Sequence, residues 1–98
     1  MRLNNQEKQT IKRYANKYFG KTSKVIIFGS RTDDARKGGD IDILIDGPEK
    51  EKLNLDNKIK FLAALKTELE DQKIDVILTT LSGQNIINTA MKNGVELK

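Results

Sequence analysis

The sequence predicts one mixed α/β (α+β) domain in which helices cover a small three-stranded sheet. Short β-branched runs alternate along the chain with longer segments of helical periodicity, a pattern typical of helices packed on a sheet. The chain has 98 residues, enough for one compact domain, and no repeat or linker divides it. We therefore treat residues 1–98 as a single domain.

Three segments carry the signals of helices. Residues 4–19 begin with Asn4 and Glu7, a capping-box pair, and end before Gly20. Residues 54–70 repeat apolar side chains at helical spacing. Their expected inner face consists of Leu55, Ile59, Leu62, Leu65 and Leu69. Ser82 is expected to cap a last helix that Gly94 ends. The inward residues of that helix are expected to be Ile86, Ile87, Ala90 and Met91.

Three segments read as strands: residues 24–28, 40–46 and 73–79. The first is a β-branched run that ends at Gly29, and the second alternates strictly until Gly47. A helix joins the second strand to the third, so we expect these two to be parallel. The short connection between the first and second strands favours an antiparallel pair, with the second strand in the middle of the sheet.

Composition excludes several kinds of chemistry. The chain contains no cysteine and no histidine, which excludes disulfides, thiolate metal sites, zinc–histidine chemistry and histidine-based catalysis. Any metal here must be held by oxygen, which favours Mg²⁺, Mn²⁺ or Ca²⁺. The apolar runs are too short for a transmembrane helix or a secretory signal, so we expect a cytoplasmic protein without a membrane partner.

The net charge of +4 is unevenly distributed. Residues 1–24 hold seven basic residues and one acidic residue, whereas the remainder has a net charge of −2. The basic first segment could bind nucleic acid or an acidic partner, or it could be a solvated helix face.

Acidic side chains interrupt the apolar strands. Asp40 and Asp42 share one face of the second strand, where two carboxylates repel each other. Asp75 lies near the start of the third strand, which meets the start of the second if the two are parallel. Three clustered carboxylates form an oxygen site suited to one or two Mg²⁺ ions. The alternative is an exposed strand start with no role.

A candidate phosphate-binding turn lies at the same edge of the sheet. Gly29 allows backbone N–H groups to approach a phosphate, and Ser30 adds a hydroxyl donor. Arg31, Arg36 and Lys37 lie in the following loop, within reach of a polyphosphate. A phosphate-binding turn beside a carboxylate-held metal pair is what nucleotidyl transfer requires.

Gly29-Ser30, a loop of nine residues and then Asp40-x-Asp42 in an apolar strand resemble the signature of the DNA polymerase beta-like nucleotidyltransferase superfamily. The small size resembles its minimal (MNT) branch, the MntA-like antitoxins that pair with HEPN toxins. The match is strongest over residues 25–46, and the "IDVIL" and "NGVEL" stretches also fit. The loop before Asp40 is one residue shorter than the commoner loop of this branch.

The resemblance implies a polymerase beta palm-like fold and a site for each part of the substrate. It makes Asp40, Asp42 and Asp75 the catalytic and metal-binding carboxylates. Gly29 and Ser30 would hold the nucleotide phosphates, with Arg31 and Arg36 as further nucleotide-binding residues. It also implies two Mg²⁺ ions, ATP as substrate and transfer of AMP to a HEPN-domain toxin within a hetero-oligomer.

Two other functions stay open at this level. The chain could be a non-catalytic binding module that neutralises a partner protein by contact, through the basic first helix and the last helix. It could also transfer a nucleotide to RNA, DNA or a small molecule. The sequence disfavours nucleic acid, because it has only five aromatic residues and most of them fit a core.

Overall fold

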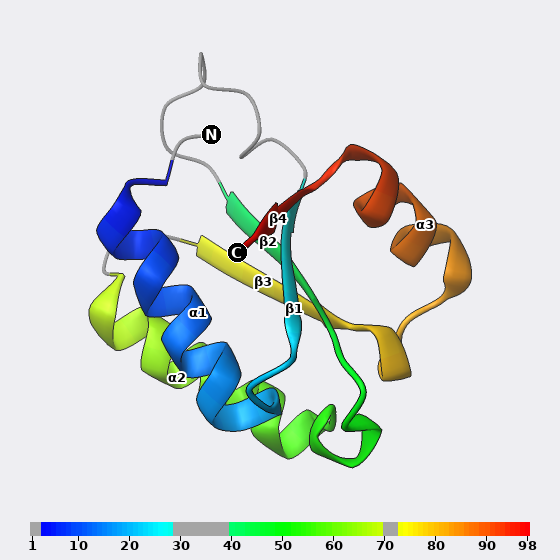
Figure 1. Cartoon of the computed structure of the whole chain (residues 1–98), viewed down its shortest axis with the longest axis horizontal. Helices are drawn as coiled ribbons and strands as arrows, with labels where there is room; N and C mark the ends of the chain where they lie inside the picture. The colour runs from blue at the N-terminus through cyan, green and yellow to red at the C-terminus, as the bar shows by residue number, and fades with distance from the viewer. Residues whose placement is uncertain (1–2, 29–39, 70–72) are drawn as a thin grey trace.

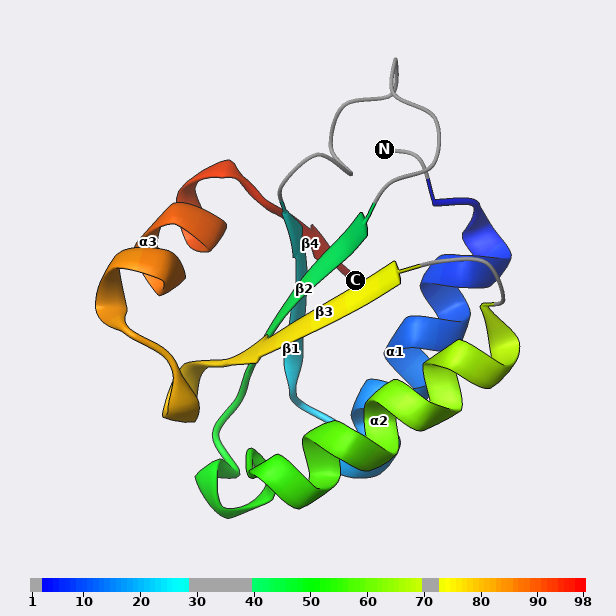
Figure 2. The same ribbon diagram turned by 180° about the vertical axis from the view of Figure 1, so that it is seen from behind.

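The computed structural model describes residues 3–28, 40–69 and 73–98. The helices and strands are α1 (Asn5–Phe19), β1 (Lys24–Phe28), β2 (Asp40–Asp46), α2 (Leu55–Glu68), β3 (Lys73–Leu78), α3 (Gln84–Asn93) and β4 (Val95–Leu97). Two 3₁₀ turns accompany them, η2 (Lys50–Lys52) and η3 (Thr79–Leu81). The predicted α/β class is confirmed: α1 and α2 lie together on one face of the sheet and α3 lies on the other (Figure 1 and Figure 2).

The strands form one sheet in the order β3-β2-β1-β4. As predicted, β1 and β2 are antiparallel, β2 and β3 are parallel, and β2 lies between them. The expected count of three strands is wrong by one, because β4 pairs antiparallel with β1 at the far edge. Since β4 has only three residues, its alternation is too short to be recognised in the sequence.

The larger part of the core lies between the sheet and the helix pair α1–α2. Ile41, Ile43 and Ile45 of β2 are fully buried on this face. Phe19 of α1 meets Phe61 of α2 edge to face, with ring centroids 5.2 Å apart. Each such buried side chain contributes roughly 1.5–3 kcal/mol to folding. The sheet is thereby fixed on one side, and the side chains between these isoleucines must point to the other.

The ends of α1 are set by local chemistry that the sequence predicted. The Glu7 backbone N–H donates to the Asn4 side chain at 2.7 Å, and the Asn4 backbone N–H donates to the Glu7 carboxylate at 2.9 Å. Gly20 ends the helix with φ of +106°, a conformation that other residues rarely adopt. A Cβ atom at this position would also collide with the side chain of Glu49.

The inner face expected for α2 is only partly correct. Leu65 and Leu69 are buried as predicted, but Leu55 and Ile59 are 58% and 57% exposed. Phe61 is fully buried in their place. The apolar arc of this helix is wider than its contact with α1 and the sheet, so one side of the arc remains in solvent.

Two predictions about α3 are also corrected. The N-cap residue is Gly83 rather than Ser82, and no side chain caps this end of the helix. Ile86 and Met91 were expected to face inward, but they are 44% and 43% exposed. The buried residues of α3 are Ile87 and Ala90. The helix has ten residues and packs on a small cluster around Ile26 and Leu44, so it buries only a thin stripe.

The described helices are short. The longest of them, α1, has 15 residues and is strongly amphipathic in sequence. None of the helices in the described ranges combines the length and the hydrophobicity needed to cross a membrane.

Candidate active site

Two of the predicted carboxylates lie side by side in neighbouring strands. Asp42 of β2 and Asp75 of β3 are register partners in the parallel pair. Neighbouring strands lie roughly 4.8 Å apart, so the two side chains leave the sheet at almost the same point. The expectation that these two acids meet at one end of the sheet is confirmed.

Both side chains point to the α3 face of the sheet. Their chain neighbours Ile41, Ile43, Ile74 and Val76 belong to the core on the opposite face. Phe28 of β1 is the register partner of Asp42 on its other side. The α3 face therefore carries a row that runs from Phe28 through Asp42 to Asp75 across three strands.

The two carboxylates differ in exposure. Asp42 is half-buried and makes a polar interaction, whereas Asp75 is exposed. Next to these residues on the same face, Ile26 of β1 and Leu44 of β2 form a small core with α3. A ligand can thus reach Asp75 from solvent and Asp42 behind it, while α3 closes the adjacent part of the sheet.

The other predicted site residues are described only in part. The backbone of Asp40 begins β2 opposite Lys73, and its side chain lies outside the described structure. The remaining predicted positions lie outside the described residues: Gly29, Ser30, Arg31, Arg36 and Lys37. Among the side chains that are described, no group of three or more His, Cys, Asp or Glu could hold a metal ion. The third carboxylate of the site stays a prediction.

A cavity of about 490 Å³ opens next to the two carboxylates. It follows β3 from Ile74 to Ile77 and is closed by Lys58 and Leu62 of α2 and by Ile86 of α3. The sequence offered the last helix, which carries Ile86, as a binding surface of the alternative function, but it did not single out Lys58 or Leu62. No local signal marks the groove, because its walls come from separate elements that meet only when both helices pack beside β3.

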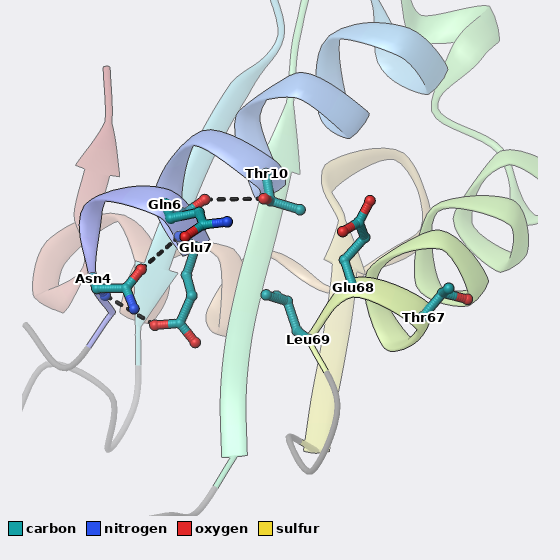
Figure 3. A pocket seen from close by; sticks show the side chains of 7 residues that line it. All are labelled: Asn4, Gln6, Glu7, Thr10, Thr67, Glu68 and Leu69. Carbon is teal, nitrogen blue, oxygen red and sulfur yellow. Dashed lines mark hydrogen bonds between the residues drawn. The ribbon is translucent and has the colours of Figure 1, made fainter.

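A second cavity, of about 410 Å³, lies between the start of α1 and the end of α2, on the other face of the sheet (Figure 3). Several of its polar groups are already engaged. Asn4 and Glu7 bond each other, and the Thr10 hydroxyl donates to the Gln6 carbonyl at 2.9 Å. The Glu68 carboxylate accepts a hydrogen bond from Tyr14 at 3.1 Å. This cavity offers helix-capping contacts, so we place the chemistry at Asp42 and Asp75.

Asp46, at the far end of β2, has a structural role. Its carboxylate accepts hydrogen bonds from Lys50 at 2.9 Å and from the Thr79 hydroxyl at 2.8 Å. Burial raises the pKa of Asp46, but the bonds from Lys50, Thr79 and the backbone of Gly47 outweigh it and hold the pKa below its ordinary value. Asp46 thus ties η2 and η3 to the end of the sheet.

The family model described as "Polymerase beta, Nucleotidyltransferase" matches residues 9–98. The chain therefore belongs to this nucleotidyltransferase family. The predicted family, the palm-like fold and the carboxylate pair agree with one another. Among curated proteins, none matches the sequence.

Solved structures of toxin–antitoxin complexes contain chains with the same fold. A mutant MntA–HpeT complex is similar with a TM-score of 0.78 and 18% identity, over 98% of this chain and 73% of that one. A structure described as a tri-AMPylated Shewanella oneidensis HEPN toxin in complex with an MNT antitoxin gives a TM-score of 0.73 and 17% identity, over 95% of this chain and 70% of that one. A toxin–antitoxin structure with AMP-PNP gives a TM-score of 0.77 and 17% identity, over 93% of this chain and 72% of that one.

Proposed function

We propose that this nucleotidyltransferase transfers AMP from ATP to a protein acceptor with the help of Mg²⁺, as the cytoplasmic antitoxin of a HEPN–MNT pair. The observation that carries the proposal is the Asp42–Asp75 pair, which lines a groove along β3 between α2 and α3. Two adjacent carboxylates in a family of nucleotidyltransferases are best explained as part of a site for a divalent cation.

The donor set fits Mg²⁺. The chain has neither cysteine nor histidine, and the described part of the site supplies carboxylate oxygen from two neighbouring strands. Asp40, Asp42 and Asp75 would hold the metal, in a two-ion site. Bound Mg²⁺ supplies the positive charge that offsets the clustered carboxylates and the triphosphate.

In this proposal the nucleotide lies on the β1 side of Asp42. Gly29 and Ser30 follow Phe28, the register partner of Asp42, and would hold the phosphates with the help of Arg31 and Arg36. An acceptor hydroxyl oxygen forms a bond to the α-phosphorus while the bond from that phosphorus to the bridging oxygen breaks. Pyrophosphate leaves with that oxygen, and the hydroxyl proton passes to water.

The similar structures support a HEPN partner and ATP. One of them is described as a tri-AMPylated HEPN toxin in complex with an MNT antitoxin, and another as a toxin–antitoxin with AMP-PNP. At 17% identity these chains share the fold with this one. The transfer of AMP to a HEPN protein and a stable hetero-oligomer are therefore proposed for this chain by analogy.

A second candidate function is neutralisation by contact alone, without transfer. The exposed side chains of Leu55 and Ile59 favour it, because they give α2 an apolar outer stripe. Such a stripe fits a protein partner whether or not the carboxylates act.

The experiment is labelling with ATP that is radioactive at its α-phosphate, in a lysate of the source cells with Mg²⁺. The wild type is compared with Asp42→Asn and with Asp56→Asn, a control on α2 that removes the exposed ion pair to Lys60. We expect protease-sensitive label on a macromolecule with the wild type and the control, and none with Asp42→Asn. Label that persists in Asp42→Asn would refute catalysis at this site. Label that is sensitive to nuclease would show that the acceptor is a nucleic acid instead of a protein.

The same variants separate transfer from contact. Protection of cells from the toxin that survives Asp42→Asn supports neutralisation by contact. Protection that is lost together with the label supports AMP transfer.

A further inference from the structure

The outer edge of β3 carries no further strand in the described part of the chain. β3 ends the sheet that these residues form, and β2 is its neighbour there. In Figure 2 it lies in front of the other strands, with α2 on one side and α3 on the other, and no described helix or strand crosses its edge. An edge strand of this kind presents backbone N–H and C=O groups that an added strand can bind.

The groove runs along this edge and is not confined to one face. Ile74, Asp75, Val76 and Ile77 all line it, although they are consecutive in the chain. Side chains alternate between the two faces of a strand, so Ile74 and Val76 point toward α2 and the other two point toward α3. A ligand that meets all four must therefore lie beside the main chain of β3.

Among its described lining residues, the groove has an apolar wall on each side and one cation, Lys58, besides the carboxylates of Asp42 and Asp75. Leu62 of α2 is half-buried, and Ile86 of α3 is 44% exposed. Lys58 of α2 lines the groove, and none of the ion pairs between described residues includes it. These features suit an extended peptide with apolar side chains on both faces and an acidic residue near Lys58.

The position of Asp75 gives the direction of approach. In the proposed function, on which this inference rests, the phosphates lie beyond Phe28, on the β1 side of Asp42. In an in-line displacement the attacking oxygen approaches from the side opposite the leaving pyrophosphate. Asp75 separates Asp42 from the free edge, so the attacking hydroxyl comes from the β3 side.

We propose that an extended segment of the acceptor protein adds to the outer edge of β3 as a further strand. Leu62 and Ile86 hold the segment on its two faces, and its hydroxyl-bearing residue lies over Asp75. Main-chain hydrogen bonds to β3 give this mode its affinity, and the pockets for alternate side chains give it specificity.

The test compares two glutamate substitutions at equally exposed apolar positions. Ile86→Glu places a charge in the groove, whereas Val95→Glu, also at a 44% exposed residue, lies on β4 at the opposite edge of the sheet. The acceptor is the protein that the wild type labels in the experiment above, in purified form. We expect Ile86→Glu to raise the KM for this acceptor about tenfold or more. Affinity for Mg²⁺ with a non-hydrolysable ATP analogue should not change, and Val95→Glu should match the wild type in both.

Hydrogen–deuterium exchange adds a readout that a merely structural change would not produce. In the complex with the acceptor, those backbone amides of residues 74–77 that point away from β2 should exchange at least about tenfold more slowly. Protection confined to α1 or β4 would overturn the proposal.

Three further outcomes would overturn it. The first is a KM for the acceptor that is the same in Ile86→Glu and in the wild type. The second is a KM that Val95→Glu raises as much as Ile86→Glu does. The third is a wild-type dimer in sedimentation equilibrium that Ile86→Glu dissociates, which assigns the groove to a second copy of this chain. A wild type that labels no protein refutes the proposed function and this inference together, and that result is visible before either variant is assayed.

Discussion

The pairing of Asp42 with Asp75 predicts that the metal-free protein becomes more stable when one of these charges is removed. The register places the two residues in adjacent strands, roughly 4.8 Å apart. Two unit charges at that separation repel by about 0.9 kcal/mol in a water-like dielectric and by about 3.5 kcal/mol at an effective dielectric of 20. Asp75 is exposed, so the lower value applies. We therefore expect Asp75→Asn to raise the melting temperature by roughly 4 °C.

The assay is thermal unfolding followed by circular dichroism, with a chelator present, at about 0.01 M and 1 M salt. The Debye length falls from about 30 Å to about 3 Å between these conditions, so the gain should shrink strongly at high salt. Glu96→Gln is the control, because it makes the same change in net charge. Glu96 lies on β4 opposite Ile26, in a groove that Lys8 and Lys12 also line, so its removal should give no gain.

Magnesium should reverse the order of stability. Binding of Mg²⁺ to the folded wild type adds RT ln(1 + [Mg²⁺]/Kd) to its free energy of unfolding. The Asp75→Asn protein has lost a metal ligand, so Mg²⁺ adds less to its free energy of unfolding. The reasoning is refuted if Asp75→Asn shows no gain at low salt, if its gain is the same at high salt, or if Glu96→Gln gains as much.

Three other predictions concern the scaffold. Asp46→Asn should lower stability by about 1 kcal/mol in urea unfolding at neutral pH. Because the folded-state pKa of Asp46 is depressed, this contribution is complete above the unfolded pKa and is lost as pH falls through the folded pKa, so the two proteins should converge in acid; a constant difference would contradict this. Phe61→Ala should cost about 3–5 kcal/mol, whereas Ile59→Ala should cost less than about 0.5 kcal/mol; equal losses would show that the buried face of α2 is misplaced. Asn4→Ala should cost about 1 kcal/mol in thermal unfolding and speed amide exchange in the first turn of α1, and an unchanged exchange rate would argue against the capping box.

The helix α2 shows where sequence reasoning succeeds and where it stops. Its existence and length followed from the helical repeat of apolar residues, because that repeat is a local property of the chain. Its buried side did not follow, since the apolar arc is wide enough to include both Ile59 and Phe61. The contact of Phe61 with Phe19 selects one side of this arc, and that contact depends on how two distant segments pack.

The candidate site divides in the same way. The types and spacing of Asp40, Asp42 and Asp75 predicted a carboxylate cluster, because an apolar strand that carries acids needs a compensating charge. The nucleotidyltransferase family was predicted from the resemblance that Gly29-Ser30 and Asp40-x-Asp42 carry together. The walls of the groove were not predictable, because Leu62 and Ile86 are ordinary helix residues until both helices pack beside β3.

The sequence by itself thus determined the order of the three helices and of the first three strands, the absence of sulfur and imidazole ligands, and the family. These properties depend on residue type and short-range spacing. The tertiary structure alone decided that β4 joins the sheet, that Asp42 and Asp75 are direct neighbours, and that the edge of β3 lies in an open groove. Each of these depends on contacts between segments far apart in the chain, which no local pattern specifies.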